Sequence, residues 1–153
     1  MSKFGFLSIL EEELDKHFSY DFAMDWDKKN HAVEVAFVLE AGLPEGVAIE
    51  ELDGEEAVVL EEFVLFYNPD KSQFDADDYL VTIPYEPKKG LSREFLTYFA
   101  HFLQTTADQG MDDLLDFLAD PEVDEFAMVW NAEAFEQGRA EVVETEWYPY
   151  PRY

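Results

Sequence analysis

Two alternating segments around a short polar turn constrain the fold of this chain more than any other feature. In each segment every second residue is apolar: Phe22, Met24 and Trp26 in the first, then Val33, Val35, Phe37 and Leu39 in the second. The turn between them, Asp27–Asn30, is entirely polar. Alternation with a period of two on both sides of a turn predicts an antiparallel hairpin with one buried face. We therefore expect a sheet early in the chain, against which neighbouring helices bury their apolar sides.

The length of 153 residues predicts a single domain, 1–153. Hydrophobic residues make up 48% of the chain and aromatic residues 16%, which is enough to build a packed core. There is no cysteine, so disulfides and thiolate chemistry are excluded. The apolar run 4–10 is short and leads directly into acidic residues, which indicates a helix start and not a signal peptide. No apolar run is long enough to span a membrane, and we expect a cytoplasmic protein.

Apolar spacing predicts further helices and strands around the hairpin. A helix is expected at 4–18, with Glu11, Glu12 and Glu13 facing water. The other predicted helical segments are 93–108, 111–119 and 132–137. The other predicted strands are 47–52, 57–67, 79–85, 126–130 and 139–147. Together these elements predict an α+β fold: a mostly antiparallel sheet of about five to seven strands with helices packed on one face.

Small residues mark the expected ends of the predicted helices. Ser92 is a candidate N-cap for the helix at 93–108, because its hydroxyl can accept a hydrogen bond from an amide of the first turn. Gly110 and Gly138 are interpreted as helix ends, since glycine commonly follows the last helical residue. The helical pattern between Ser92 and 119 is therefore divided into two helices.

Two features of the chain leave alternatives open. The segment 148–153 is rich in tyrosine and proline, and it either packs back on the sheet or forms an extended partner-binding segment. The sequence Phe22–Trp26 is echoed at Phe126–Trp130, which is either a trace of an old helix–strand–strand duplication or a chance match in a chain with many aromatic residues.

The net charge of −26 is the strongest compositional feature. The segment 31–67 contains acidic residues but no lysine or arginine, and in 94–153 the basic residues are Arg139 and Arg152. Such a charge repels nucleic acids and anionic lipids, so neither direct nucleic-acid binding nor membrane association is expected. It would attract basic proteins, polyamines or divalent cations, although an acidic surface also serves solubility alone.

Two groups of carboxylates are the candidate binding residues. A rigid acidic surface can imitate the phosphates of a nucleic acid and thereby occupy a basic protein, whereas the ordinary alternative is a solvated face. The first group is Glu50, Glu51, Asp53, Glu55, Glu56, Glu61 and Glu62. The second group is Asp108, Asp112, Asp113, Asp116, Asp120, Glu122, Asp124 and Glu125. In the second group, Asp112, Asp113 and Asp116 share one helix face by their spacing.

Catalytic and cofactor motifs are not found in the sequence. There is no Gly-x-Ser-x-Gly, no glycine-rich phosphate loop and no zinc-binding spacing, and the three histidines are far apart. The segment that starts at Asn68 begins like an EF-hand loop, but Gln73 and Tyr79 occupy the positions that require glycine and glutamate. We therefore predict no catalytic residue, no metal and no cofactor.

The N-terminal segment carries a resemblance to a known family. The helix at 4–18, the segment 20–31 and the strand Val33–Glu40 resemble the bacterial family called domain of unknown function 3013. The similarity extends over most of the chain, since that family is about this size. The resemblance implies a small α+β cytoplasmic protein, and it brings no activity, cofactor or catalytic residue with it.

These features favour a non-enzymatic acidic protein that binds a partner, with a basic protein expected in preference to a small molecule. The alternative is an enzyme whose carboxylates and histidines converge in the fold. A deep pocket that holds His31 or His101 beside a buried carboxylate would favour the enzyme. A symmetric homo-oligomer that uses exposed aromatic residues is the third alternative.

Overall fold

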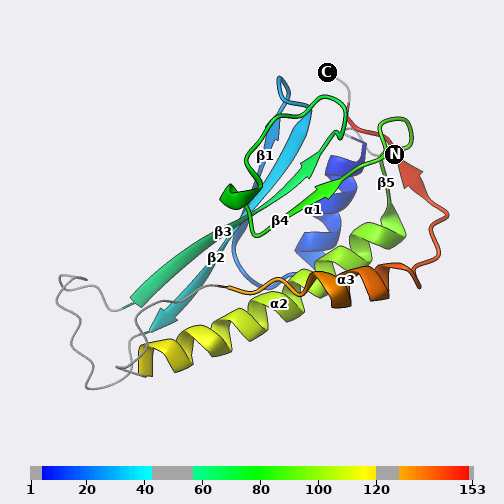
Figure 1. The fold of residues 1–153 in the computed structure, drawn as a ribbon. Helices are drawn as coiled ribbons and strands as arrows, with labels where there is room; N and C mark the ends of the chain where they lie inside the picture. Colours follow the sequence, from blue (N-terminus) through cyan, green and yellow to red (C-terminus); the bar gives the residue numbers. More distant parts are fainter. Residues whose placement is uncertain (1–4, 43–56, 120–127, 152–153) are drawn as a thin grey trace.

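The computed structural model describes residues 5–42, 57–119 and 128–151. It is an α+β structure in which a four-stranded sheet of order β1-β2-β3-β4 is covered on one face by helices (Figure 1). The strands are β1 (Phe22–Asp27), β2 (Ala32–Gly42), β3 (Ala57–Tyr67) and β4 (Val81–Pro84). The helices are α1 (Phe6–His17), α2 (Arg93–Ala119) and α3 (Ala132–Arg139), with a short 3-10 helix, η2 (Ala76–Asp78). A small second sheet pairs β5 (Leu91–Ser92) with β6 (Trp147–Tyr148). None of the helices within these ranges has the length and apolar character that crossing a membrane requires.

The predicted hairpin is confirmed. β1 pairs antiparallel with β2, from Phe22 opposite Phe37 to Asp27 opposite Ala32. His31 is the last residue of the turn. Its φ of 54° lies in the left-handed region, which helps the chain to reverse direction here. The β2 residues predicted to share one face are all at most 1% exposed: Val33, Val35, Phe37 and Leu39. We call the face that they form the inner face of the sheet, and the opposite one the outer face.

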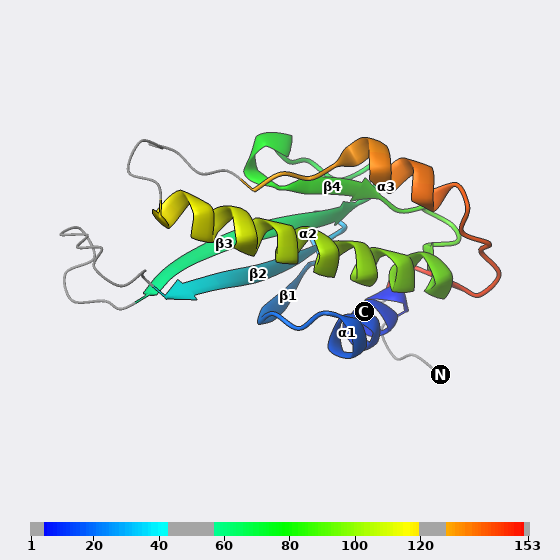
Figure 2. The same ribbon diagram turned by 90° about the horizontal axis from the view of Figure 1, so that it is seen from below.

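The core lies between the inner face and the two longer helices. α1 contributes Phe6, Leu10 and Leu14, and α2 contributes Phe95, Phe99 and Leu103, all fully buried. Phe66 of β3 contacts Phe99 edge-on, with ring centroids 5.1 Å apart. α3 packs on α2 through Phe135, whose ring centroid lies 5.0 Å from that of Phe102. Figure 2 shows α2 lying along the sheet with α1 beside it, so the apolar stripes predicted for 4–18 and 93–108 both face the core.

The main sheet has four strands, not the five to seven that the sequence predicts. The predicted strand 57–67 is confirmed as β3, which lies between β2 and β4, whereas β4 is shorter than the predicted strand 79–85 and pairs parallel with β3. The strand predicted at 139–147 is wrong, because only Trp147–Tyr148 pairs, in the second sheet. Of the strand predicted at 126–130, the described residues 128–130 form no strand, and 126–127 lie outside the described residues. Within its described residues, 128–130, the echo of Phe22–Trp26 therefore repeats no strand. The strand predicted at 47–52 lies outside the described residues.

Gly110 and Gly138 do not end helices, and the predicted division of α2 is wrong. α2 runs without a break from Arg93 to Ala119, and α3 continues past Gly138 to Arg139. Each glycine lies where another side chain comes close: a Cβ on Gly110 would be 3.2 Å from Met128, and one on Gly138 would be 2.3 Å from the Tyr98 hydroxyl. Close packing therefore explains why glycine occupies both positions, and neither glycine ends a helix.

The start of α2 is fixed by capping and by the C-terminal segment. Ser92 is the N-cap as predicted, since its Oγ accepts a hydrogen bond from the Phe95 N–H at 3.0 Å. The Glu94 carboxylate accepts main-chain N–H bonds from Glu146 at 3.0 Å and Thr145 at 2.8 Å. These bonds, the one from Glu146 above all, hold the pKa of Glu94 below its usual value.

The aromatic tail packs back on the domain. The Tyr150 ring stacks on the Tyr85 ring at a centroid distance of 5.0 Å and an angle of 8°. The Trp26 Nε1–H donates a hydrogen bond of 2.7 Å to the Tyr150 hydroxyl. Gly5 allows the tail to pass close to α1, because a Cβ there would lie 2.1 Å from the Pro149 carbonyl oxygen. Of the two interpretations of this segment, packing on the domain is the one that the described tail residues adopt.

Replacing Tyr150 separates the stacking from the hydrogen bond. We expect Tyr150→Ala to lower the free energy of unfolding by about 2 kcal/mol, because it removes the ring that lies on Tyr85. Tyr150→Phe keeps the ring and removes the hydroxyl that accepts the bond from Trp26, so about 1 kcal/mol is expected. Urea denaturation followed by tryptophan fluorescence measures both. Equal stability of Tyr150→Ala and the unaltered protein would show that the tail contact contributes nothing.

Candidate functional site

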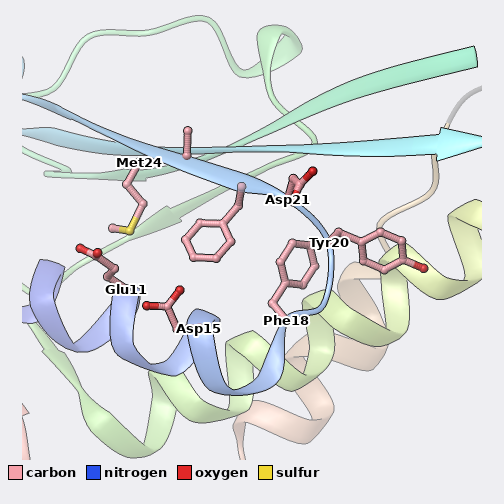
Figure 3. Close-up of a pocket in the computed structure, with 8 residues that line it drawn as sticks. Glu11, Asp15, Phe18, Tyr20, Asp21 and Met24 are labelled. Atoms are coloured by element: carbon pink, nitrogen blue, oxygen red, sulfur yellow. The ribbon is translucent and has the colours of Figure 1, made fainter.

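A groove lies between α1 and the edge strand β1, with a volume of about 490 Å³ (Figure 3). We call it the α1–β1 groove. Its lining residues are Glu11, Asp15, Phe18, Tyr20, Asp21, Phe22, Ala23 and Met24. In Figure 3 the side chains of Glu11 and Asp15 extend from α1 toward β1, whereas that of Asp21 is turned to the other side of the strand. The segment that links α1 to β1 closes one end of the groove.

The carboxylates of α1 divide into two pairs with different surroundings. Glu13 is buried, contrary to the prediction that it faces water, and its Oε2 lies 3.2 Å from Arg93 Nη1 of α2. Glu12 is 3.1 Å from Lys16 Nζ, and this bond first, then Arg93, holds the pKa of Glu12 below its usual value. These two acids are therefore compensated by basic side chains at the contact between α1 and α2.

Glu11 and Asp15 have no such compensation. Both are exposed, they lie one helical turn apart, and neither forms an ion pair within the described part of the chain. Like charges at this spacing on a helix repel each other by a few tenths of a kcal/mol. The α1–β1 groove thus has two negative charges on its helical wall that nothing in the described residues offsets.

Aromatic rings form the floor and one end of the α1–β1 groove. Phe18 is 5% exposed and contacts Phe22 edge-on, with ring centroids 6.2 Å apart. Tyr20 is fixed to α2, because its hydroxyl donates a hydrogen bond of 2.7 Å to Asp108 Oδ1. Burial first, and then this bond, raises the pKa of Tyr20 to about 12, so the phenol remains a hydrogen-bond donor at neutral pH. The groove therefore combines aromatic rings with two carboxylates on its helical wall.

A second, smaller hollow lies on the other side of the same edge strand. It has a volume of about 200 Å³, and we call it the outer hollow. Asp21, Phe22 and Ala23 line both this hollow and the α1–β1 groove. The remaining lining residues of the outer hollow are Ala36, Phe37, Val38 and Glu61. The two hollows therefore meet along the start of β1.

Acidic residues also occupy the outer face beside β1. Asp25 of β1 lies directly opposite Glu34 of β2, and like charges in this position destabilise a sheet. Burial first, then the charges of Asp25, Glu61 and Asp27, raises the pKa of Glu34. Both sides of the open edge are therefore negatively charged.

Two of the three histidines converge, at the contact between α1 and α2. The rings of His17 and His101 have centroids 4.1 Å apart, and His17 Nε2 is 3.7 Å from Glu13 Oε1. His31 lies apart from them and contacts the Tyr150 ring at 6.2 Å. No histidine lines the α1–β1 groove or the outer hollow. Among the described residues, no three side chains of His, Asp or Glu are grouped so that they could hold a metal ion.

Comparison with known proteins identifies the family. The family model described as protein of unknown function (DUF3013) matches residues 1–152. The chain belongs to the DUF3013 family. A crystal structure of a conserved protein of unknown function from Enterococcus faecalis is similar to it, with a TM-score of 0.85 and 44% sequence identity over 99% of this chain and 98% of that one. Among curated proteins, none matches the chain significantly. The resemblance of the N-terminal segment is thus confirmed over nearly the whole length.

The acids predicted from the sequence of this DUF3013 protein are distributed over different surfaces. Glu61 reaches the rim of the outer hollow, whereas Glu62 is half-buried and burial raises its pKa. The exposed Asp112 and Asp116 and the half-buried Asp113, whose Oδ1 accepts a bond from Gln109, belong to the second half of α2. The other predicted residues of the first group lie outside the described residues: Glu50, Glu51, Asp53, Glu55 and Glu56.

The sequence prediction missed the acids of the α1–β1 groove. Glu11 and Asp15 were indistinguishable from Glu12 and Glu13, because all four are acids within five consecutive residues of the same predicted helix. The available signal was their spacing of one helical turn, followed within a few residues by three aromatic side chains. That pattern places two carboxylates beside an aromatic segment.

The raised pKa of Glu34 predicts a pH-dependent stability. The folded protein holds the Glu34 proton more tightly than the unfolded chain does, so ionisation of this group at neutral pH costs stability. We expect Glu34→Gln to raise the free energy of unfolding at pH 7 by roughly 0.5 to 1 kcal/mol. The gain should shrink as the pH falls through the raised pKa toward the ordinary value of 4.5. Thermal denaturation between pH 4 and 8 tests this, with the exposed Glu40→Gln as control. A gain that persists unchanged at low pH would contradict it.

Proposed function

We propose that this DUF3013 protein is a non-enzymatic binding protein that takes a basic segment of another protein into the α1–β1 groove. The observation that carries the proposal is the pair of carboxylates, Glu11 and Asp15, which no described residue compensates and which lie beside aromatic rings in the groove. Lysine and arginine have a long aliphatic stem and a cationic end. A groove with apolar contacts below and carboxylates at its wall complements both parts of such a side chain.

The net charge of −26 supports the same proposal. A strongly negative field accelerates the encounter with a basic partner and disfavours acidic ones, nucleic acids among them. Small-molecule chemistry has less support, because the groove contains carboxylates but no histidine. The pair His17 and His101, with the buried Glu13, lies at a helix contact outside both hollows. The enzyme alternative therefore has no pocket of the kind that it requires among the hollows described.

A matched pair of double variants tests the groove. We expect Glu11→Gln/Asp15→Asn to weaken binding of a capped, dye-labelled peptide of alternating arginine and valine by roughly tenfold at low salt, since each lost charge pair contributes up to about 1 kcal/mol. The control, Asp112→Asn/Asp116→Asn, removes the same charge at the same helical spacing from α2. Fluorescence anisotropy measures the affinity, and circular dichroism confirms that both variants fold.

The control decides between three outcomes. A loss confined to Glu11→Gln/Asp15→Asn supports the groove, and added salt should reduce the difference by screening. An equal loss in both double variants would mean that net charge alone attracts the peptide. A larger loss in Asp112→Asn/Asp116→Asn would place the binding surface on α2 and contradict the proposal.

A further inference from the structure

β1 presents an open edge of the sheet along the α1–β1 groove. It is the terminal strand of the order β1-β2-β3-β4, and among the described residues no strand pairs with its other side. The Val38 N–H donates a hydrogen bond of 3.1 Å to the Asp21 carbonyl, so the main chain of Asp21 faces β2. Main-chain groups alternate in direction along a strand. The N–H and C=O groups of Phe22 and Met24 consequently face outward, at the edge.

The hollows on both sides of this edge match the alternation of an added strand. Side chains of a strand point alternately to opposite faces of the sheet. At the edge of β1, one direction leads into the α1–β1 groove and the other into the outer hollow. The groove presents Glu11 and Asp15, whereas the outer hollow is lined mainly by small or apolar residues, such as Ala23, Ala36 and Val38.

We propose that the basic partner binds as an extended segment that adds a strand to the edge of β1, with arginine or lysine side chains in the α1–β1 groove and small apolar side chains in the outer hollow. The inference rests on the proposed function and specifies the conformation and residue pattern of the partner. Main-chain hydrogen bonds to Phe22 and Met24 provide affinity that is independent of sequence, and the two hollows select the alternation of side chains.

Charge selects a basic segment over a second copy of this chain. Two β1 strands paired edge to edge would bring Glu11, Asp15, Asp21 and Asp25 of each copy toward the same residues of the other. With a net charge of −26 on each chain, that approach is opposed both locally and overall. Charged residues commonly protect an open edge from such self-pairing. Here the acidic residues oppose a second copy of the chain but not a basic peptide segment.

The length of β1 sets the length of the added strand. Lys28 follows β1 and its Nζ lies 4.7 Å from the centroid of the Trp26 ring. This cation lies at the Asp27 end of the strand, and Asp21 lies just before its start at Phe22. β1 has six residues, about 20 Å of strand, so a segment of about six residues spans it.

Methylation of the peptide backbone distinguishes strand addition from general charge attraction. The probe is the capped peptide of alternating arginine and valine, offered to the unaltered full chain. One derivative carries N-methyl groups on every arginine amide and the other on every valine amide, so charge and composition are the same in both. Methylation blocks hydrogen bonding on one edge of an extended peptide and leaves the other edge intact. We expect one derivative to lose at least about tenfold in affinity by anisotropy, and the other to bind nearly as tightly as the parent peptide.

The methylated peptide that loses affinity also gives the orientation of the added strand relative to β1. In antiparallel pairing, a peptide residue directly opposite Phe22 or Met24 points its side chain to the same face as that residue, which is the side of the α1–β1 groove. Its own N–H and C=O groups then bond to those of Phe22 or Met24. Loss on arginine methylation therefore indicates antiparallel addition, and loss on valine methylation indicates parallel addition. Hydrogen exchange gives an independent reading on the protein: the amides of Phe22 and Met24 should become protected when the parent peptide binds, whereas that of Ala23, which faces β2, should change little.

Each other outcome overturns the inference in a recognisable way. If both methylated peptides bind like the parent, and Glu11→Gln/Asp15→Asn still weakens binding, the groove recognises charge without adding a strand. If the parent peptide does not bind, the proposed function fails as well, and the acids at the edge only prevent self-association. If light scattering shows a dimer in which Phe22 and Met24 are already protected, the edge is occupied by a second copy.

Discussion

The packing of α1 and α2 on the inner face of β2 and β3 is the constraint on which the rest of the structure depends. Because both helices pack on the same face and against each other, one side of α1 is committed to the sheet and another to α2. Glu12 and Glu13 are thereby directed to Arg93 and Lys16, and the opposite side of α1 is left beside the terminal strand. The groove and its unequal charges are consequences of burying two apolar stripes on one surface.

Local sequence patterns predicted the elements whose formation depends on residues close together in the sequence. The hairpin was predictable because strict alternation leaves only one face for burial, and β3 was predictable from its many apolar residues on both faces. The strand predicted at 139–147 failed because Thr145 and Glu146 donate their amides to the Glu94 side chain, where a sheet partner was expected. Gly110 was misread for a related reason: its closeness to Met128 is a tertiary contact that the sequence does not display. In both of these failures, a contact with a residue distant in the sequence determined the structure, and the local pattern did not.

The candidate site was less predictable than the fold. The sequence showed that acids dominate and led to the prediction of a basic partner, but it directed attention to the densest acidic runs. Glu11 differs from its neighbour Glu12 because α2 places Arg93 beside Glu12 and not beside Glu11. Compensation of charge, and not its density, separates Glu11 and Asp15 from the other two carboxylates of α1, and compensation is a property of the tertiary structure.

The contact between the two ends of the described chain has a kinetic consequence. The Phe6 N–H donates a hydrogen bond of 2.9 Å to the Pro149 carbonyl, which closes nearly the whole chain into one loop. Closing a loop of that length costs more entropy than any contact within the hairpin, so the tail should dock after the sheet and helices have formed. It should likewise detach first, as a local opening that leaves the core intact. The Phe6 amide is then a reporter of that opening, and its exchange rate distinguishes a loosened tail from global unfolding.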